Sequence, residues 1–348
     1  MVTTTTPSSS LTRPGAVDGH GIDAGVPAHY GDPMGEQRRL AGAAALVDLT
    51  HRGLVRVTGP DRLTWLHSMT TQKLDDLAPH HGVETLVLSP HGHVEHAIHV
   101  VDDGESAWLG VEPGTADALV QWLTSMQFML RVQVTDVSAD FAQFGQVCDE
   151  AGSAEQYAAD GTLVWVDPWP TMGPDSASYS GDGPHPATGR RWREVIVPRD
   201  RAADFVGDRP LSGTLAAEAL RVADWRPRLG ADTDHRSIPH ELDWLRTAVH
   251  LHKGCYRGQE TVARVHNLGR PPRRVVFLHL DGSGHLLPEP GAQLRVPGVE
   301  RPVGVITTVA RHHEDGPIAL AVVKRSTPTD VDLVADDCAA AQTVIVTP

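Results

Sequence analysis

Apolar and polar residues follow a pattern that predicts two rounds of mixed strands and helices, followed by a region of strands alone. In the first round, Pro90, His91 and Gly92 separate two strand-like runs and predict a hairpin. Thr115 is a candidate cap for the second helix. The predicted elements are a strand at 54–58, a helix at 63–69, strands at 84–88 and 94–101, a helix at 115–126 and a strand at 132–134. This β-α-β-β-α-β order is typical of the ferredoxin-like split motif.

The second round is less regular than the first. Strand-like runs at 162–166 and 193–197 flank a loop at 171–189 that is rich in Gly, Pro and Ser, and a helix is predicted at 211–222. A loop of this length is uncommon in a compact domain, so it is either functional or an insertion.

After Pro271 and Pro272 the pattern changes to short strand-like runs separated by turns. The runs lie at 275–280, 292–296, 303–309, 318–323, 331–334 and 343–346. Such spacing predicts a small antiparallel barrel or sandwich.

The predicted organisation has three parts. Residues 1–35 are rich in Thr, Ser, Pro and Gly without apolar periodicity, which predicts a disordered tail. Residues 36–270 contain the two rounds of mixed strands and helices, divided at about 36–138 and 139–270, and residues 271–348 form the C-terminal barrel or sandwich. The expected fold class is therefore α+β.

Composition narrows the classes of function. Hydrophobic residues make up 40% of the 348 positions and charged residues 21%, as in globular proteins, so most of the chain should fold. The net charge of −14 argues against general nucleic-acid binding. No apolar stretch reaches the roughly 20 residues of a membrane span, and no signal sequence is visible, so we expect a cytoplasmic protein without membrane contact.

The three cysteines, Cys148, Cys255 and Cys338, are widely spaced and form no CxxC pair, so neither a disulfide framework nor a structural zinc site is indicated. Cys255 stands out because Gly254 and Gly258 bracket it and a helical pattern follows at 261–265. A helix start and nearby cations favour a thiolate. The alternative is an inert buried thiol, since free cysteines are among the most buried residues.

Charge distinguishes the segment from 253 to 274, which carries six Lys or Arg residues against one acid, Glu260, a local balance of +5. This reversal within an acidic chain suits a small anionic ligand. The alternative is a solvated basic linker. Glu260 and Arg264, four residues apart, are equally compatible with a simple surface pair on a helix.

The segment Lys253-Gly254-Cys255-Tyr256-Arg257-Gly258-Gln259-Glu260, followed by Val262-Ala263-Arg264, resembles the K-G-C-Y-x-G-Q-E-x-x-A-R signature of the YgfZ family of folate-dependent iron–sulfur proteins. That family is related to the T protein of the glycine cleavage system, a tetrahydrofolate-dependent aminomethyltransferase. Weaker similarity extends over about 300 residues. The resemblance implies a cloverleaf of two ferredoxin-like halves and a barrel around a central folate cavity.

The resemblance also implies roles for individual residues. Cys255 becomes the essential reactive or ligand-positioning group. The expected folate-binding residues are Glu241, Lys253, Gly254, Tyr256, Gly258, Gln259, Glu260 and Arg264. Glu241 is the best candidate to hydrogen-bond a pterin ring, because a carboxylate can accept two parallel donors. Its alternative is a solvated loop acid.

Three departures separate this chain from the transferases. An Asp-Asp pair after the first hairpin is replaced by His96 and Ala97, and Glu95 cannot be assumed to substitute, because neighbouring strand residues face opposite sides. An acid of the transferases is replaced by Cys255, and no Gly-Tyr-Thr-Gly-Glu type motif occurs in the second half. Departures from the bacterial YgfZ proteins occur at Arg52 and Ala217, where tryptophans pack against folate.

His91, His93, His96 and His99 fall within nine residues, but no Cys or paired carboxylate completes a familiar metal-ligand set, so no metal site is predicted. Three scattered cysteines also do not suit a permanently bound cluster.

We therefore expect a protein that binds tetrahydrofolate, or a one-carbon derivative, and supports iron–sulfur cluster assembly or repair, with iron–sulfur enzymes or assembly proteins as transient partners. The first alternative is a folate-dependent aminomethyl- or methyltransferase. The second is a binding module that senses folate without chemistry. Whether a reaction is catalysed is left open.

Overall fold

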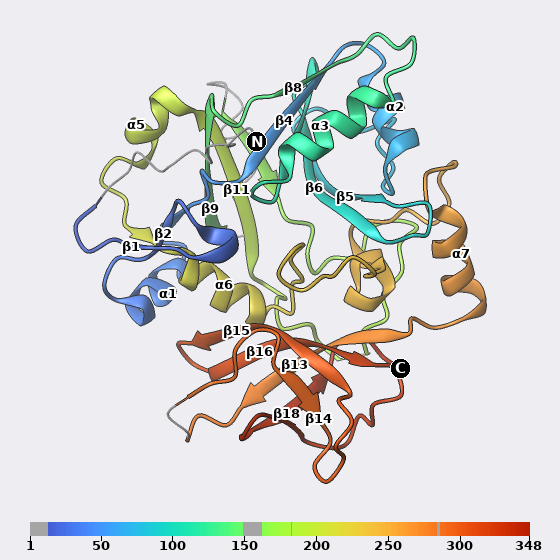
Figure 1. Cartoon of the computed structure of the whole chain (residues 1–348). Coiled ribbons are helices and arrows are strands. Elements are labelled where there is room, and N and C mark those ends of the chain that lie inside the picture. Colours follow the sequence, from blue (N-terminus) through green and yellow to red (C-terminus); the bar gives the residue numbers. More distant parts are fainter. Residues whose placement is uncertain (1–12, 149–161, 182, 284–285) are drawn as a thin grey trace, which may run out of the picture.

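The computed structural model describes residues 13–148, 162–181, 183–283 and 286–348. Within them the chain forms two five-stranded sheets, a two-stranded ribbon and a closed barrel. Figure 1 shows the first sheet with its helices α2 and α3 at the upper right of the molecule. The second sheet with α1 and α6 lies at the left, and the barrel lies below both sheets.

The first sheet has the strand order β5-β6-β7-β4-β8, with every neighbouring pair antiparallel. Its strands are β4 (Gly53–Thr58), β5 (Gly82–Leu88), β6 (Val94–Asp102), β7 (Ser106–Val111) and β8 (Gln133–Asp136), and its helices are α2 (Arg62–Met69) and α3 (Ala116–Ser125). Trp65 of α2 and Leu119 and Leu123 of α3 pack on the same side of the sheet as Val55 and Val57. The predicted hairpin is confirmed as the pair β5–β6.

Two details of this sheet differ from the sequence prediction. Strand β7 was not predicted, because it is central in the sheet and all six of its residues are buried, which removes the alternation that marks a strand. Thr115 occupies the N-cap position of α3, yet its hydroxyl donates to the Glu112 carbonyl instead of accepting from a helix N–H.

The second sheet is mixed, with the order β10-β11-β9-β3-β12, in which β3 and β12 run parallel. Its strands are β3 (Leu46–Asp48), β9 (Phe141–Cys148), β10 (Leu163–Val166), β11 (Arg191–Pro198) and β12 (Leu211–Ser212). Its helices are α1 (Pro33–Ala41), α5 (Ala202–Val206) and α6 (Thr214–Ala223), with a 3-10 turn, η2, at Arg199–Arg201. The two sheets meet where Leu54 and Trp108 pack against Leu163 and Ile196.

The predicted disordered tail at 1–35 differs from the structure over its second half. Residues 1–12 lie outside the described residues, but the chain then forms β1 (Val17–Asp18), the 3-10 turn η1 (Gly21–Asp23) and β2 (Pro27–His29). Val26 is buried, and Asp23 bonds to His51 and Arg228. These contacts are distant in sequence, so local periodicity could not reveal them.

The predicted barrel is confirmed as a closed six-stranded structure in the order β13-β16-β15-β14-β17-β18. Its strands are β13 (Arg273–Leu280), β14 (Gln293–Arg295), β15 (Gly304–His312), β16 (Gly316–Lys324), β17 (Leu333–Ala335) and β18 (Cys338–Val344). Leu278, Leu294 and Ile306 belong to its fully buried interior.

The segment between α6 and the barrel contains two 3-10 turns, η3 (Pro239–Leu242) and η4 (Trp244–Arg246), and the helix α7 (Gln259–Leu268). Figure 1 shows the gold turns before α7 in the middle of the molecule and α7 at its right edge. Its Leu242, Trp244 and Leu245 share a buried cluster with Leu86 of β5 and Phe277 of the barrel. Across the described ranges, no helix is long and apolar enough to cross a membrane.

Candidate functional site

The loop that contains the sequence signature is held by Lys253. Its buried ammonium donates hydrogen bonds to the backbone carbonyls of His67 in the last turn of α2 and of Thr70 and Gln72 just after that helix. Burial lowers the pKa of Lys253 to about 8. Lys253 therefore braces the loop against the first sheet and does not face an open site.

Two glycines let the signature loop approach the β5–β6 turn. Gly258 is the N-cap of α7 with φ of 85°, and a Cβ there would lie 2.6 Å from the Ser89 carbonyl oxygen. A Cβ on Gly92 would lie 2.7 Å from Cβ of Thr261 in α7. Such distances exclude any side chain at either position without movement of the backbone.

Cys255 is exposed, four residues before the first residue of α7. A Cβ on the neighbouring Gly254 would meet nothing within 4 Å, so this part of the loop opens to solvent. The alternative of an inert buried thiol is therefore wrong for Cys255, whereas Cys148 and Cys338 are buried.

The other predicted folate-binding residues are either buried within the protein or lie on the surface of α7. Tyr256 is buried in the central cluster, and burial raises its pKa. Glu241 is buried and accepts two hydrogen bonds from Arg273. Glu260 and Arg264 are exposed and Gln259 is half-buried, and the described residues show no Glu260–Arg264 ion pair.

Most cations of the basic segment are bound within the protein. Arg257 pairs with Glu95, Arg273 with Glu241 and Asp234, and the buried Arg274 donates to the Thr327 carbonyl. Together with Lys253, four of the six cations are thus bound by other parts of the chain, which leaves few of them for an anionic ligand.

A central cavity of about 1050 Å³, counting its opening to solvent, lies between the two sheets and the segment that follows α6. None of the nine predicted site residues lines it. Its apolar lining includes Trp169, Trp192 and Trp244, and its polar lining has seven acids and five arginines. The acids are Asp23, Glu84, Glu112, Asp167, Glu194, Glu218 and Asp224, and the arginines are Arg52, Arg190, Arg221, Arg226 and Arg228.

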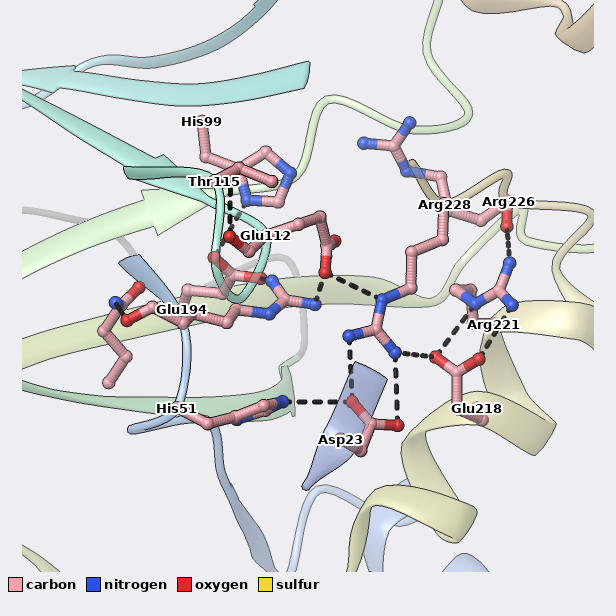
Figure 2. Close-up of polar contacts among 12 residues, drawn as sticks. Asp23, His51, His99, Glu112, Thr115, Glu194, Glu218, Arg221, Arg226 and Arg228 are labelled. Atoms are coloured by element: carbon pink, nitrogen blue, oxygen red, sulfur yellow. Dashed lines mark hydrogen bonds and ion pairs between the residues drawn. The ribbon is translucent and has the colours of Figure 1, made fainter. Parts of the chain in front are cut away.

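Arg228 is the centre of this ionic network. Its Nη2 lies 2.8 Å from Oδ1 of Asp23, its Nε 2.9 Å from Oε2 of Glu112, and its Nη1 3.1 Å from Oε1 of Glu218. Figure 2 shows the three acids converging on this guanidinium from different elements. Asp23 also contacts His51, so the N-terminal segment closes one side of the cavity.

Glu194 of β11 is fully engaged on the opposite wall. Arg52 binds one carboxylate oxygen and His99 Nδ1 lies 2.9 Å from the other. Burial raises the pKa of Glu194, but the charges of Arg52 and His99 outweigh burial and hold that pKa well below its usual range. The His99 ring stacks on Trp165 at a centroid distance of 3.6 Å, which fixes its orientation.

Strand β6 forms the wall where the transferases were expected to carry paired acids. Ala97 lines the cavity, so no carboxylate projects there. The register of β6 against β5 skips Glu95, and this bulge leaves Glu95 exposed beside Arg257. His96 is buried and burial lowers its pKa to about 4.

Arg52 and Ala217, the two departures from the YgfZ pattern, both line the cavity. The sequence comparison therefore pointed to this cavity through those two positions. It missed the other charged lining residues, whose only local signal was the cluster Arg221, Arg226 and Arg228 in one short segment.

The histidine cluster does not assemble. His91 and His93 belong to the turn before β6, with ring centroids 6.2 Å apart, whereas His96 and His99 lie within the strand. Across the described part of the chain, no group of three potential ligands is arranged to hold a metal ion.

Residues 15–147 match the family model of the GCVT N-terminal domain. An aminomethyltransferase of Moorella thermoacetica is 25% identical over 87% of this chain and 84% of its own length. A putative chloroplastic transferase of Arabidopsis thaliana is 26% identical over 76% of this chain, which spans 61% of that relative. A mitochondrial iron–sulfur cluster assembly factor (IBA57 homolog) of Neurospora crassa is 24% identical over 71% of this chain and 57% of its own length.

The crystal structure of glycine cleavage system aminomethyltransferase T from Bartonella henselae superimposes with a TM-score of 0.73 at 17% identity, covering 96% of this chain and 93% of that one. This likeness confirms the predicted T-protein-like fold.

Proposed function

We propose that this chain binds tetrahydrofolate, or a one-carbon derivative of it, in the central cavity. The single observation that carries the proposal is the central cavity itself, which is lined by three tryptophans and lies within a T-protein-like fold. Buried Oδ1 of Asp224 and buried Nη1 of Arg190 lack hydrogen-bond partners, so the wall retains polar capacity for a ligand.

The proposed cellular role is support of iron–sulfur cluster assembly or repair in the cytoplasm, through transient contact with iron–sulfur enzymes or assembly proteins. Two observations support it. Cys255 is exposed on a loop whose backbone is braced by Lys253, so its thiol can meet another protein. Ala97 replaces a carboxylate on the cavity wall, which disfavours acid–base chemistry at that point.

The alternative is a folate-dependent aminomethyl- or methyltransferase. The likeness to aminomethyltransferases over most of both chains favours it. Bound tetrahydrofolate would supply the one-carbon carrier in either case. The residues of the signature loop stay predicted contacts of folate. A ligand in the central cavity would, however, lie against Trp169, Trp192 and Asp224, which line its wall.

The test combines binding with cellular function. Tetrahydrofolate binding is measured by calorimetry, and the activities of iron–sulfur enzymes are measured in cells that carry the wild-type chain or Cys255→Ala. We expect both chains to bind tetrahydrofolate equally and only the wild type to sustain the enzymes.

A matched control is Cys338→Ala, which removes a buried thiol in the barrel. Full enzyme activity with Cys255→Ala would refute the role of Cys255. Turnover of aminomethyl-lipoyl carrier protein with tetrahydrofolate would establish the transferase instead, and absence of tetrahydrofolate binding would refute the ligand.

A further inference from the structure

Most charges that line the cavity neutralise one another. Six of the seven acids and four of the five arginines take part in hydrogen-bonded ion pairs. The pairs are Arg52 with Glu194, Arg221 with Glu218, Arg226 with Glu84 and Asp167, and Arg228 with Asp23, Glu112 and Glu218. Groups held in this way have little capacity left for a ligand.

Asp224 and Arg190 are the exception. Nη1 of Arg190 lies 3.3 Å from Oδ1 of Asp224, but the geometry makes no hydrogen bond, and neither atom has a hydrogen-bond partner in the described part of the chain. Both residues line the cavity, and their side chains keep some exposure, 29% for Arg190 and 15% for Asp224.

The position of Asp224 is unfavourable for a carboxylate in the empty protein. Asp224 caps the C-terminus of α6, where the helix dipole repels negative charge. Burial, and then the nearby Asp167, raise its pKa to about 7, although Arg190 opposes them. An acid that faces a cavity, has a raised pKa and is held only by an ion pair without a hydrogen bond is a candidate ligand-binding group.

We propose that Asp224 and Arg190 form the subsite that receives the polar edge of the pterin ring. This inference rests on the proposed function. The pterin edge presents N–H donors beside a carbonyl oxygen, and a carboxylate accepts parallel donors while a guanidinium donates to the carbonyl. Trp169 borders the subsite, because its Nε1 donates to the Asp224 backbone carbonyl at 2.9 Å.

Charge decides which end of the ligand enters. The cavity lining carries seven acids against five arginines, so it disfavours the anionic glutamate tail of a folate. A neutral pterin that is rich in donors meets no such repulsion. The pterin therefore lies inside, against Asp224, and the tail extends toward the opening.

The subsite makes binding depend on pH. The charged or titratable neighbours are Arg190 across the pair, Asp167 with its partner Arg226, and His185, which packs against Trp169. Ligand donors require the carboxylate form of Asp224, so affinity falls as pH drops below about 7. Burial, and then Arg246, lower the pKa of His185 to about 4, so His185 does not change charge in that range.

The test compares wild type with Asp224→Asn, using tetrahydrofolate under anaerobic conditions. We expect affinity to fall about tenfold to a hundredfold, as for loss of a charged hydrogen bond. A tetrahydropterin without the tail should lose affinity in parallel, whereas any binding of p-aminobenzoylglutamate should stay unchanged. The decline in affinity below pH 7 should disappear in the variant.

Thermal unfolding separates a binding role from a structural one. A folded pKa above the unfolded value of 3.8 means that the charged form weakens the fold above pH 7 and that the penalty is lost as pH falls toward 4. Asp224→Asn should therefore raise the melting temperature of the ligand-free protein at pH 8. Asp61→Asn, which alters a pair with Arg131 outside the cavity, is the matched control and should leave affinity unchanged.

A lower melting temperature together with lower affinity would identify a structural ion pair and overturn the assignment. Unchanged affinity would overturn it while leaving the folate proposal intact. Absence of tetrahydrofolate binding by the wild type would overturn both. Arg190→Gln provides a second variant, in which affinity should also fall because the donor to the ligand carbonyl is lost.

Discussion

The signature loop and the central cavity carry different kinds of information. The loop is contiguous in sequence, and its Lys253, Gly258 and Tyr256 mainly hold structure. The cavity has no sequence signature, yet seven acids and five arginines line it. A short recognisable motif therefore marks where the chain is braced, while the central cavity is built from residues that no local pattern connects.

The two regions are joined by β6. Ala97 lines the cavity, and Glu95 of the same strand pairs with Arg257 of the loop. A change in loop position can thus reach the cavity wall through one strand. The following predictions test how far the regions are separate, beginning with the largest effect.

Replacing the hub of the cavity should have the largest effect on folding. Arg228→Met leaves Asp23, Glu112 and Glu218 short of a partner, and we expect a loss of roughly 3–5 kcal/mol in the free energy of unfolding. Urea denaturation measures it. Arg131→Met, which breaks the surface pair with Asp61, should cost no more than about 1 kcal/mol. Equal effects of both substitutions would show that the cavity network adds nothing to stability.

Lys253→Met tests whether the loop is as structural as its contacts indicate. The substitution leaves the carbonyls of His67, Thr70 and Gln72 without their donor, so we expect a loss of about 2–4 kcal/mol. The exposed Lys73 pairs with Asp76, and Lys73→Met is the matched control. If Lys253→Met unfolds at the same urea concentration as the wild type, the loop is not braced through this residue.

Acid should lower the stability of the protein through His96 of β6, the strand that borders both regions. Burial lowers the pKa of His96 to about 4, below the ordinary value of 6.5, so its contribution to stability is complete above pH 6.5 and is lost as pH falls toward 4. The free energy of unfolding of the wild type should fall between pH 7 and pH 4. We expect this fall to be smaller by about 1–3 kcal/mol in His96→Leu. Burial lowers the pKa of His240 in the same direction, so part of the loss should persist. The exposed His91 supplies the control His91→Leu, and identical acid profiles for both variants would contradict the assignment.

Sequence patterns predicted those elements whose apolar spacing is visible locally. The six barrel strands and the β5–β6 hairpin belong to this group. Strand β7 was missed because burial on both faces removes alternation, and β3 because only three residues form it. Residues 13–35 were assigned to a disordered tail because their order depends on contacts such as Asp23 with Arg228, which lie far apart in sequence.

The candidate site was predicted only in part for a similar reason. Positions 52 and 217 were identified through the family resemblance, and both line the cavity. The sequence did not identify Asp224 and Arg190 as site residues, because an acid at the end of a helix is common. Only the fold shows that Asp224 lies in a cavity and that its Oδ1 has no hydrogen-bond partner. Pairing within the lining, and hence the Arg190–Asp224 ion pair that makes no hydrogen bond, follows only from the assembled structure.

The smallest expected effect on folding belongs to Cys255, where the loop meets solvent. Because Cys255 is exposed, Cys255→Ser should change the free energy of unfolding by no more than about 0.5 kcal/mol. Iodoacetamide should label the native wild-type protein once, at Cys255, and should label the buried Cys148 and Cys338 only after unfolding. Mass spectrometry of the native protein distinguishes these sites, and Cys255→Ser should take up no label. Labelling at Cys148 or Cys338 under native conditions would show that the interior opens readily, and would undermine the contrast between a solvent-facing thiol and a closed core.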